Sequence, residues 1–324
     1  MSLHPWRVVF LDRNTLSPDT TLRPLSFPHE LQVYDHTTDD QVAERIAQAD
    51  VVITNKVRLS RQSIQQAARL KLVAVAATGT DMVDLAACAD HGVVVSNIRG
   101  YAVNSVPEHV FALMFALRRN IVAYHASVQA GRWQQAQQFC YFDYPISDLA
   151  GSTLGIVGQG ALGQAVATIG RALGMRVLFA GRKDGAARGS LYTPFQQFLA
   201  ECDVITLHCP LNADTHHLIS DHEFSLMARQ PLLINTARGG LVNDEALVQA
   251  MRTGQIAGAG IDVVDAEPPP ASHPLMSLLD MPNFILTPHI AWASRQAIQA
   301  LADQLIDNIN AFQCGTAKNV VAQP

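Results

Sequence analysis

The sequence predicts an α/β fold made of two units with parallel sheets. Three observations predict it. Short β-rich runs alternate with helix-like segments along most of the 324-residue chain, which indicates crossover connections between parallel strands. A glycine-rich motif, LGIVGQGALGQAVATIGRALG at residues 154–174, begins a second series of such alternations, which we expect to form a doubly wound sheet. The length suits about two domains, each with a core of its own.

The composition describes a globular chain. Hydrophobic residues make up 48% and charged residues 16% of it, and no stretch approaches the roughly 18 uninterrupted apolar residues of a membrane span. The net charge is -5 and no block of Lys and Arg occurs, which argues against nucleic acid or an anionic membrane as the main partner. We therefore expect small molecules as partners, and neither nucleic acid nor membrane.

The cysteines have no metal-ligand spacing. No charged-then-apolar signal segment precedes the first expected strand. We therefore expect a cytoplasmic location and no metal site, and interpret the cysteines as small buried hydrophobes. They are Cys88, Cys140, Cys202, Cys209 and Cys314.

The first hundred residues predict one α/β unit. The loops 77–80 and 97–101 follow two of its strands, at the edge of a parallel sheet where ligands usually bind; the alternative is that they are ordinary turns. The expected strands are 7–11, 51–54, 72–76 and 93–96, with helices at 39–49, 59–70 and 81–90.

Residues 107–130 form a long amphipathic segment, which predicts a single helix that crosses to the second unit. The following segment, 132–145, is aromatic and poorly periodic, so it is either a packed loop or an arm that faces a partner. We favour the arm. The apolar residues with helical spacing are Val110, Phe111, Leu113, Met114 and Leu117.

Gly158, Gly160 and Gly163 have G-x-G-x-x-G spacing, after an apolar run and before a helix-like pattern. Gly158 would make the turn, Gly160 would let a pyrophosphate approach the backbone, and Gly163 would let the helix pack on the strand. The motif therefore predicts a dinucleotide site at the N-terminus of that helix.

The alternation of strands and helices resumes after the motif. This distinguishes a true dinucleotide-binding fold from glycines that match the spacing by chance. We expect no strand after the last helix, whose apolar positions could cover the first unit. The expected strands are 176–180, 203–208, 232–235, 258–263 and 284–287, with helices at 193–201, 221–228, 244–252 and 294–312.

The end of the strand 176–180 decides the type of dinucleotide. An acidic residue about 20 residues after the glycines would bond the ribose 2'-hydroxyl of NAD, whereas Arg would accept the 2'-phosphate of NADP. The chain has Gly181, Arg182 and Lys183 there, and Asp184 lies beyond the strand. We expect NADP to be tolerated or preferred; the alternative is that the basic residues form a solvated loop and the protein uses NAD.

Three further segments complete a resemblance to a known family. They are NTARGG at 235–240, DVVDAEPP at 262–269 and TPHIAW at 287–292. Together with the glycine motif they resemble, in order and spacing, the signatures of the D-isomer-specific 2-hydroxyacid dehydrogenases. The resemblance extends over the whole chain.

The resemblance implies two Rossmann-like domains. The cofactor domain would be residues 104–293, and a smaller, flavodoxin-like substrate domain would combine 1–103 and 294–324. It also implies NAD(P)-dependent, reversible reduction of hydroxypyruvate to D-glycerate, and of glyoxylate to glycolate, by a homodimer with its interface at 107–145. The segments that most resemble hydroxypyruvate-reducing members are 55–56, 77–81, 96–101 and 289–292.

Three residues in the matching segments suit this reaction. Arg238 offers a planar fork that holds a carboxylate, and His289 can give the proton that the alkoxide needs on reduction. Glu267, bonded to the other ring nitrogen, would fix the tautomer and stabilise the imidazolium. Taken singly, Arg238 could be a surface charge, Glu267 a loop carboxylate and His289 just one of twelve histidines. Together they predict the catalytic set.

The resemblance assigns binding roles to other residues. Thr78, Gly79 and Thr80 would meet the substrate together with Arg238 and His289. Trp292 would close the pocket over it, unless it only packs at a helix start. Cys209 is expected to line the cofactor and not to act as a nucleophile. The residues expected at the cofactor are Gly158, Gly160, Ala161, Leu162, Gly163, Gly181, Arg182, Lys183, Cys209, Pro210, Thr215, Thr236, Ala237, Arg238, Asp262 and His289.

Two other functions stay open. The first is a dehydrogenase of the same family for a different 2-oxo acid, since substrate choice depends on the shape of the pocket. The second is a non-catalytic, nucleotide-sensing protein, because the family includes corepressors that read the cofactor state. A reaction rate that does not depend on Arg238 would favour the second.

Overall fold

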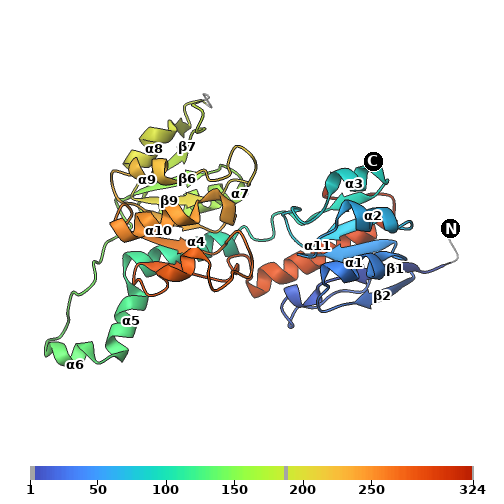
Figure 1. Cartoon of the computed structure of the whole chain (residues 1–324), viewed down its shortest axis with the longest axis horizontal. Helices are drawn as coiled ribbons and strands as arrows, with labels where there is room; N and C mark the ends of the chain where they lie inside the picture. The colour runs from blue at the N-terminus through green and yellow to red at the C-terminus, as the bar shows by residue number, and fades with distance from the viewer. Residues whose placement is uncertain (1–3, 186–188, 323–324) are drawn as a thin grey trace. The chain divides into compact units, whose positions relative to one another are not determined.

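The computed structural model describes residues 4–185 and 189–322. It divides the chain into two units (Figure 1). The first combines Met1–Tyr101 with Ala293–Pro324, and the second is Ala102–Trp292. The polypeptide therefore passes between the units twice, after Tyr101 and after Trp292.

In the described part of the first unit, six strands form one sheet in the order β13-β5-β4-β3-β1-β2. The first five strands along the chain are parallel, and their order 2-1-3-4-5 is that of flavodoxin-like folds. This agrees with the predicted fold class. The strands are β1 (Trp6–Phe10), β2 (His29–Val33), β3 (Val51–Thr54), β4 (Leu72–Val75), β5 (Val94–Ser96) and β13 (Val320–Ala322).

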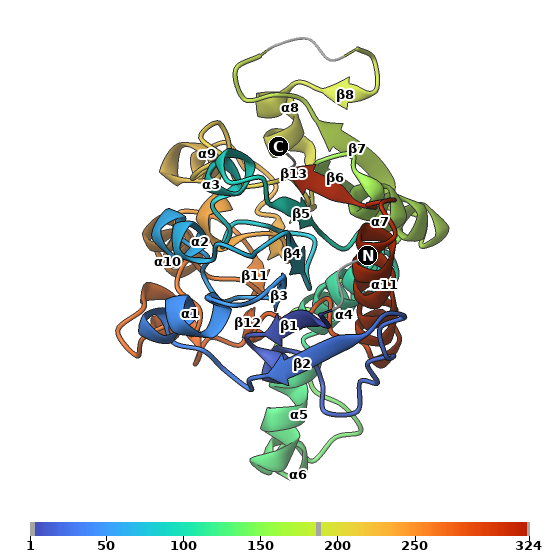
Figure 2. The same cartoon turned by 90° about the vertical axis from the view of Figure 1, so that its right-hand side faces the viewer.

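Helices cover both faces of this sheet (Figure 2). One face packs against three helices through a continuous apolar core that includes Ile46, Ile64 and Ala87. The four residues of β3 and of β4 are all buried, as expected for central strands with both faces covered. The helices are α1 (Asp39–Ile46), α2 (Arg61–Gln66) and α3 (Leu85–Asp90) on that face, and α11 (Arg295–Gln313) on the other.

Two strands of this unit were not predicted. β13 follows the last helix and pairs antiparallel with β5, so the expectation of no strand after that helix was wrong. Its three residues are too few to show a periodic pattern. β2 is an edge strand with the sequence HELQV, and four of its five residues are exposed, so it carries no apolar alternation that could reveal it.

In the described part of the second unit, seven parallel strands form one sheet in the order β12-β11-β10-β9-β6-β7-β8. Numbered within the unit, this is the Rossmann order 3-2-1-4-5-6 with one more strand. The order reverses at β6, the strand that leads into the glycine motif. The strands are β6 (Thr153–Val157), β7 (Arg176–Ala180), β8 (Tyr192–Thr193), β9 (Val204–Leu207), β10 (Leu232–Asn235), β11 (Gly258–Ile261) and β12 (Phe284–Leu286).

Two layers of helices enclose this second sheet. On one face, Phe198, Phe224 and Leu247 belong to a core shared with the strands. On the other face a Cβ at Gly260 would meet Leu113, so the helix that carries Leu113 lies close against β11. The first group is α8 (Phe195–Glu201), α9 (Asp221–Ser225) and α10 (Asp244–Thr253), and the second is α4 (Ser105–Arg118) and α7 (Ala161–Ala172).

The segment predicted as one helix over 107–130 is two helices, α4 and α5 (Ile121–Gln129). Asn120 breaks it, because its φ of 49° is left-handed and its side-chain amide donates to the Pro145 carbonyl at 2.6 Å. Apolar spacing continues across the break, so periodicity could not show it. α5 and α6 (Arg132–Ala136) project away from the sheet of their own unit (Figure 1).

The described residues include no helix long and apolar enough to span a membrane. β8 also lies outside the predicted strands, because Thr193 was placed in a helix that begins at Phe195. The other predicted helices and strands agree in type with the structure, and their ends differ by a few residues.

Candidate active site

The residues predicted at the cofactor follow six strands of the second sheet. Because parallel strands all end at the same edge, the loops after β6, β7, β9, β10, β11 and β12 gather there. Three of these loops carry the predicted catalytic residues, Arg238, Glu267 and His289.

The glycine motif forms a tight turn between β6 and α7. Gly158 has a φ of 105°, and a Cβ there would lie 2.5 Å from the carbonyl oxygen of His208, at the end of β9. A Cβ at Gly163 would overlap the carbonyl oxygen of Gly158. Side chains at these two positions would therefore force the strand, the turn and the helix apart.

The N-terminus of α7 is open. Gly160 is the N-cap residue, no side chain caps the helix, and a Cβ at Gly160 would meet nothing within 4 Å. The backbone N–H groups of the first turn are the donors that an anion binds at a helix N-terminus. They lie where the strand order reverses, which is where doubly wound sheets bind dinucleotides. The residues present thus fit the pyrophosphate of a nicotinamide dinucleotide.

A side chain at Gly181, in the loop after β7, would make a tight contact with the neighbouring strand β8. The Gly181 N–H donates to the Thr193 carbonyl at 2.7 Å, and a Cβ at Gly181 would lie 3.0 Å from the same oxygen. Beside this loop, the Tyr192 hydroxyl donates to the side chain of Gln159, between the first two glycines of the motif. The edge strand β8 therefore packs against both loops.

Arg182 and Lys183, the two basic residues of this loop, have different surroundings. The Lys183 ammonium lies 2.8 Å from the carboxylate of Glu223, which is 2% exposed, and donates to the Leu218 carbonyl at 3.3 Å. The Arg182 guanidinium is about half exposed, with Asp184 at 3.9 Å. Lys183 thus forms an ion pair with a buried carboxylate, whereas the Arg182 guanidinium is accessible to solvent.

The loop after β9 contains two titratable groups that burial keeps neutral. Burial lowers the pKa of His208 to about 4 and raises the pKa of the Cys209 thiol to about 11. A protonated thiol is a poor nucleophile, which agrees with the expectation that Cys209 does not attack the substrate. The Thr215 hydroxyl donates to the Pro210 carbonyl at 2.7 Å and closes the following turn.

Arg238 lies in the loop after β10. The Asn235 side chain accepts from the Ala237 N–H at 3.1 Å and donates to the Arg238 carbonyl at 2.8 Å, which holds the loop in a fixed turn. A Cβ at the following Gly239 would overlap the backbone of Val264. The Arg238 loop and the loop after β11 are therefore in direct backbone contact.

Glu267 and His289 form a hydrogen-bonded pair between the loops after β11 and β12. Glu267 Oε2 lies 2.6 Å from His289 Nδ1, and Glu267 Oε1 accepts from the Val264 N–H at 3.2 Å. An ionised carboxylate has no proton to give, so Nδ1 is the donor. The Nε2 atom of His289 is then the nitrogen that remains for a substrate.

The backbone of His289 is strained and held by its neighbours. Its φ of 54° is left-handed, a conformation that costs a non-glycine residue roughly 1–2 kcal/mol. Its N–H donates to the Asp262 carbonyl at 2.8 Å, and its carbonyl accepts from the Trp292 indole N–H at 2.9 Å. Hydrogen bonds to its N–H and to its carbonyl thus hold the backbone from which the His289 ring projects.

The carboxylate of Asp262 faces this same loop. It is buried and accepts from the backbone N–H groups of Ile290 at 3.0 Å and Ala291 at 2.9 Å, and from the Thr287 hydroxyl at 2.5 Å. The sequence placed Asp262 at the cofactor. The structure shows that its side chain holds the loop that carries His289.

Two residues of α4 that sequence reasoning missed also hold this loop. The Ser105 hydroxyl donates to the Ala291 carbonyl at 2.7 Å, and His109 Nε2 lies 3.1 Å from the Thr287 hydroxyl. The available signal was the spacing of Ser105 and His109, which lie four residues apart and therefore on one face of the helix.

The loops with Thr78, Gly79 and Thr80 belong to the first unit. The Thr78 hydroxyl donates to the Ile98 carbonyl at 2.7 Å, and the Asn97 side chain donates to the Thr78 carbonyl at 2.7 Å. The loops after β4 and β5 are therefore tied together. The assignment of residues 78–80 to the substrate stays a prediction.

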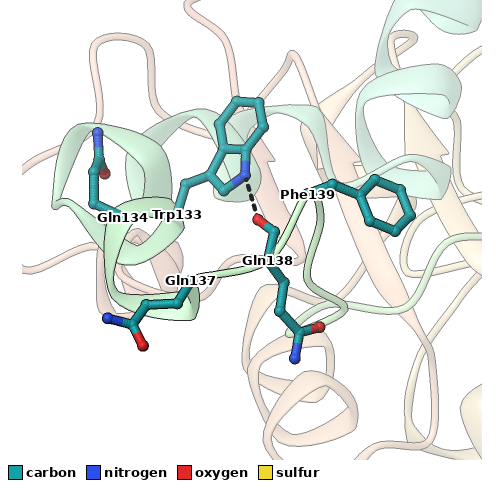
Figure 3. A pocket seen from close by; sticks show the side chains of 5 residues that line it. All are labelled: Trp133, Gln134, Gln137, Gln138 and Phe139. Carbon is teal, nitrogen blue, oxygen red and sulfur yellow. Dashed lines mark hydrogen bonds between the residues drawn. The ribbon is translucent and has the colours of Figure 1, made fainter.

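A separate hollow lies at α6, outside these loops (Figure 3). Its five lining residues include three glutamines, and the Trp133 indole N–H donates to the Gln138 carbonyl at 3.2 Å. None of the five side chains titrates near neutral pH, so the hollow lacks the groups needed for proton transfer. The lining residues are Trp133, Gln134, Gln137, Gln138 and Phe139.

Comparison with known proteins decides the family. The model of the D-isomer specific 2-hydroxyacid dehydrogenase, NAD binding domain, matches residues 111–291. This chain belongs to the D-isomer-specific 2-hydroxyacid dehydrogenases. A glycerate dehydrogenase of Methylorubrum extorquens is 52% identical to it over 97% of this chain and 98% of its own length. A hydroxypyruvate reductase of Blautia hydrogenotrophica is 35% identical over 97% and 99%.

Two solved structures share the fold of this dehydrogenase over nearly the whole chain. The D-lactate dehydrogenase of Aquifex aeolicus, complexed with NAD and lactic acid, has a TM-score of 0.83 at 27% identity, over 98% of this chain and 99% of its own. An acyclic imino acid reductase in complex with NADPH has a TM-score of 0.81 at 26% identity, over 97% and 99%. The chain is thus an NAD(P)-binding dehydrogenase in fold and family.

Proposed function

We propose that this dehydrogenase reduces hydroxypyruvate to D-glycerate reversibly, and glyoxylate to glycolate as a second reaction. The observation that carries the proposal is the pair of Glu267 and His289 at 2.6 Å, with the Arg238 loop beside it. The names of the relatives support the substrate: one is a glycerate dehydrogenase and the other a hydroxypyruvate reductase.

Each residue of the set has one task in this reaction. The Arg238 guanidinium binds the substrate carboxylate with two parallel hydrogen bonds, which fixes the direction of the adjacent carbonyl. His289 donates a proton from Nε2 to the carbonyl oxygen as it becomes an alkoxide. Glu267 keeps the proton of Nδ1 directed at itself and stabilises the positive charge of the ring before transfer. In the reverse direction His289 accepts the hydroxyl proton.

The loops of the second unit hold the cofactor. The nicotinamide dinucleotide, when bound, supplies or accepts the hydride. The backbone N–H groups of Ala161 and Leu162 would bind its pyrophosphate, next to Gly158, Gly160 and Gly163. The loops after β9 and β10, with Cys209, Pro210, Thr215, Thr236 and Ala237, line the remainder.

We propose that NADP is tolerated or preferred. Gly181 presents no carboxylate that would repel a 2'-phosphate, and the accessible guanidinium of Arg182 suits one. Lys183 contributes less, because Glu223 already holds its charge.

A panel of 2-oxo acids with NADH and NADPH in parallel tests the proposal. Hydroxypyruvate should give the highest kcat/KM, with glyoxylate lower. Turnover of a different 2-oxo acid without hydroxypyruvate would keep the reaction class and refute the substrate. Cofactor binding without turnover of any acid would favour the nucleotide-sensing alternative.

We also propose a homodimer whose interface lies in 107–145. Phe139 and Phe142 are 90% and 81% exposed, and Arg132 pairs with Asp143 within the same segment. A surface with large apolar side chains and few unpaired charges suits a second copy of itself. Light scattering should give the mass of a dimer, and of a monomer for the variant with Phe139→Ser and Phe142→Ser. The control Leu279→Ser, at another exposed apolar site, should remain a dimer. A dimer in the variant with Phe139→Ser and Phe142→Ser would refute the interface.

A further inference from the structure

Ser105 and His109 of α4 contact opposite ends of the loop that carries His289. Four residues separate them, so they lie on the same face of the helix. Ser105 bonds the Ala291 carbonyl at 2.7 Å, at the end of the loop, and His109 Nε2 lies 3.1 Å from the Thr287 hydroxyl, at its start. The helix therefore holds the loop on both sides of His289.

The contact of His109 continues into a directional chain of hydrogen bonds. The Asp262 carboxylate can only accept, so the Thr287 hydroxyl gives its one proton to Asp262 Oδ1. The Thr287 oxygen can then only accept from the ring, which requires a proton on His109 Nε2. This nitrogen is also 3.7 Å from Asp262 Oδ1. Each donor in the chain strengthens the next.

The chain ends at the backbone next to the acid/base residue. The two carboxylate oxygens of Asp262 accept from Ile290 and Ala291, and the Asp262 carbonyl accepts from His289 itself. These three contacts hold the left-handed backbone of His289. Without the ring N–H of His109, the Thr287 hydroxyl loses the hydrogen bond that orients it toward Asp262, so a change at His109 can reach the backbone of His289 through Thr287 and Asp262.

We propose that His109 is a positioning residue for His289: through Thr287 and Asp262, its Nε2–H fixes the backbone from which the catalytic imidazole projects. The proposal rests on the proposed role of His289 as acid and base. His109 itself need not touch the substrate.

The test compares His109→Leu, which removes the donor at similar volume, with His109→Gln, whose amide can donate near the position of Nε2. His109→Leu should lower kcat at least about tenfold, as expected for a small misplacement of a catalytic group, with the KM for the cofactor within about twofold. His109→Gln should restore most of kcat. The exposed His222→Leu on α9 is the matched control and should leave kcat unchanged.

Thr287→Val keeps the shape of Thr287 and interrupts the chain at its middle. It should lower kcat to a similar extent, and the double variant with His109→Leu should lose no more than either alone, because both break the same chain. Melting curves report the folded fraction, so that kcat is stated per folded enzyme. If His109→Leu does not fold, His109→Gln and Thr287→Val still decide the question.

The outcomes separate this proposal from the proposed function. An unchanged kcat in both His109→Leu and Thr287→Val, with His289→Ala inactive, would overturn the role of His109 alone. A fully active His289→Ala would overturn the proposed function instead. A loss of thermal stability with kcat per folded enzyme unchanged would show that His109 is only structural.

Discussion

The Nδ1 atom of His289 lies 2.6 Å from Oε2 of Glu267, and the two residues come from the loops after neighbouring strands, β11 and β12. The hydrogen bond joins the carboxylate to one of the two ring nitrogens, Nδ1, and leaves the other, Nε2, on the far edge of the ring. Because the carboxylate fixes the tautomer, Nε2 is the atom that can exchange a proton with a substrate. The proposed acid/base function depends on this relationship.

Replacing Glu267 by Gln should slow reduction more than it weakens binding. The amide keeps the shape and a hydrogen-bond acceptor but removes the negative charge that stabilises a protonated ring. We expect kcat to fall by about ten- to a thousandfold and the cofactor Kd to change little. Steady-state kinetics and cofactor fluorescence measure the two effects. Glu245→Gln, at an exposed position on α10, is the control, and an equal effect of both variants would contradict the role of Glu267.

Arg238→Lys should raise the KM for the 2-oxo acid. Lysine keeps the charge and loses the planar fork, so one of the two hydrogen bonds to the carboxylate cannot form. A loss of about 1.5–3 kcal/mol corresponds to a KM higher by roughly ten- to a hundredfold. The KM for the cofactor should stay the same. Arg252→Lys, an exposed position on α10, provides the comparison; a wild-type KM in Arg238→Lys would exclude bidentate binding by Arg238.

The two basic residues after β7 should respond differently to substitution. Arg182→Ala should lower kcat/KM for NADPH about tenfold or more and leave that for NADH nearly unchanged, since only a 2'-phosphate needs the guanidinium. Lys183→Ala should instead lower the melting temperature, because it leaves the buried carboxylate of Glu223 without its cation. Equal use of NADPH by Arg182→Ala and wild type would contradict the proposed 2'-phosphate contact.

Asp244 should make stability depend on pH. Its carboxyl lies 3.2 Å from His273 Nε2, and burial raises the pKa of Asp244 to about 6, with Asp265 acting in the same direction and His273 against it. The folded state then binds this proton more tightly than the unfolded state. The stability contributed by protonated Asp244 is therefore present below about pH 4 and is lost as the pH rises through 6.

Asp244→Asn removes this titration. Urea midpoints at pH 4.5 and pH 7 should show that wild type loses stability relative to the variant over this interval. The exposed Asp280→Asn should follow wild type at both pH values. A constant difference between wild type and Asp244→Asn would contradict the raised pKa.

The sequence predicted the architecture because its signals are local. The apolar runs of β3, β4 and β10 and the glycines at 158–163 each fix one element through burial or backbone conformation. Elements without such signals were missed: the polar edge strand β2, the three residues of β13, and the break at Asn120. In each case a partner distant in the sequence determines the structure, such as the Pro145 carbonyl that accepts from Asn120.

In the candidate site, too, the sequence indicated some residues and could not indicate others. Family motifs indicated Glu267 and His289 together, and the structure brings them within hydrogen-bonding distance. The contacts of Asp262, Ser105 and His109 with the His289 loop could not be inferred, because they depend on how α4 packs beside the loop after β12. The different surroundings of Arg182 and Lys183 likewise depend on a buried glutamate 40 residues further along the chain, Glu223.

The most direct measurement is the rate of hydroxypyruvate reduction by His289→Ala at saturating cofactor, next to wild type. The account predicts a kcat lower by about a hundredfold to ten-thousandfold, with cofactor binding and the melting temperature close to those of wild type. Full turnover by His289→Ala would contradict the assignment of His289 as the acid and base, and with it the mechanism proposed for this dehydrogenase.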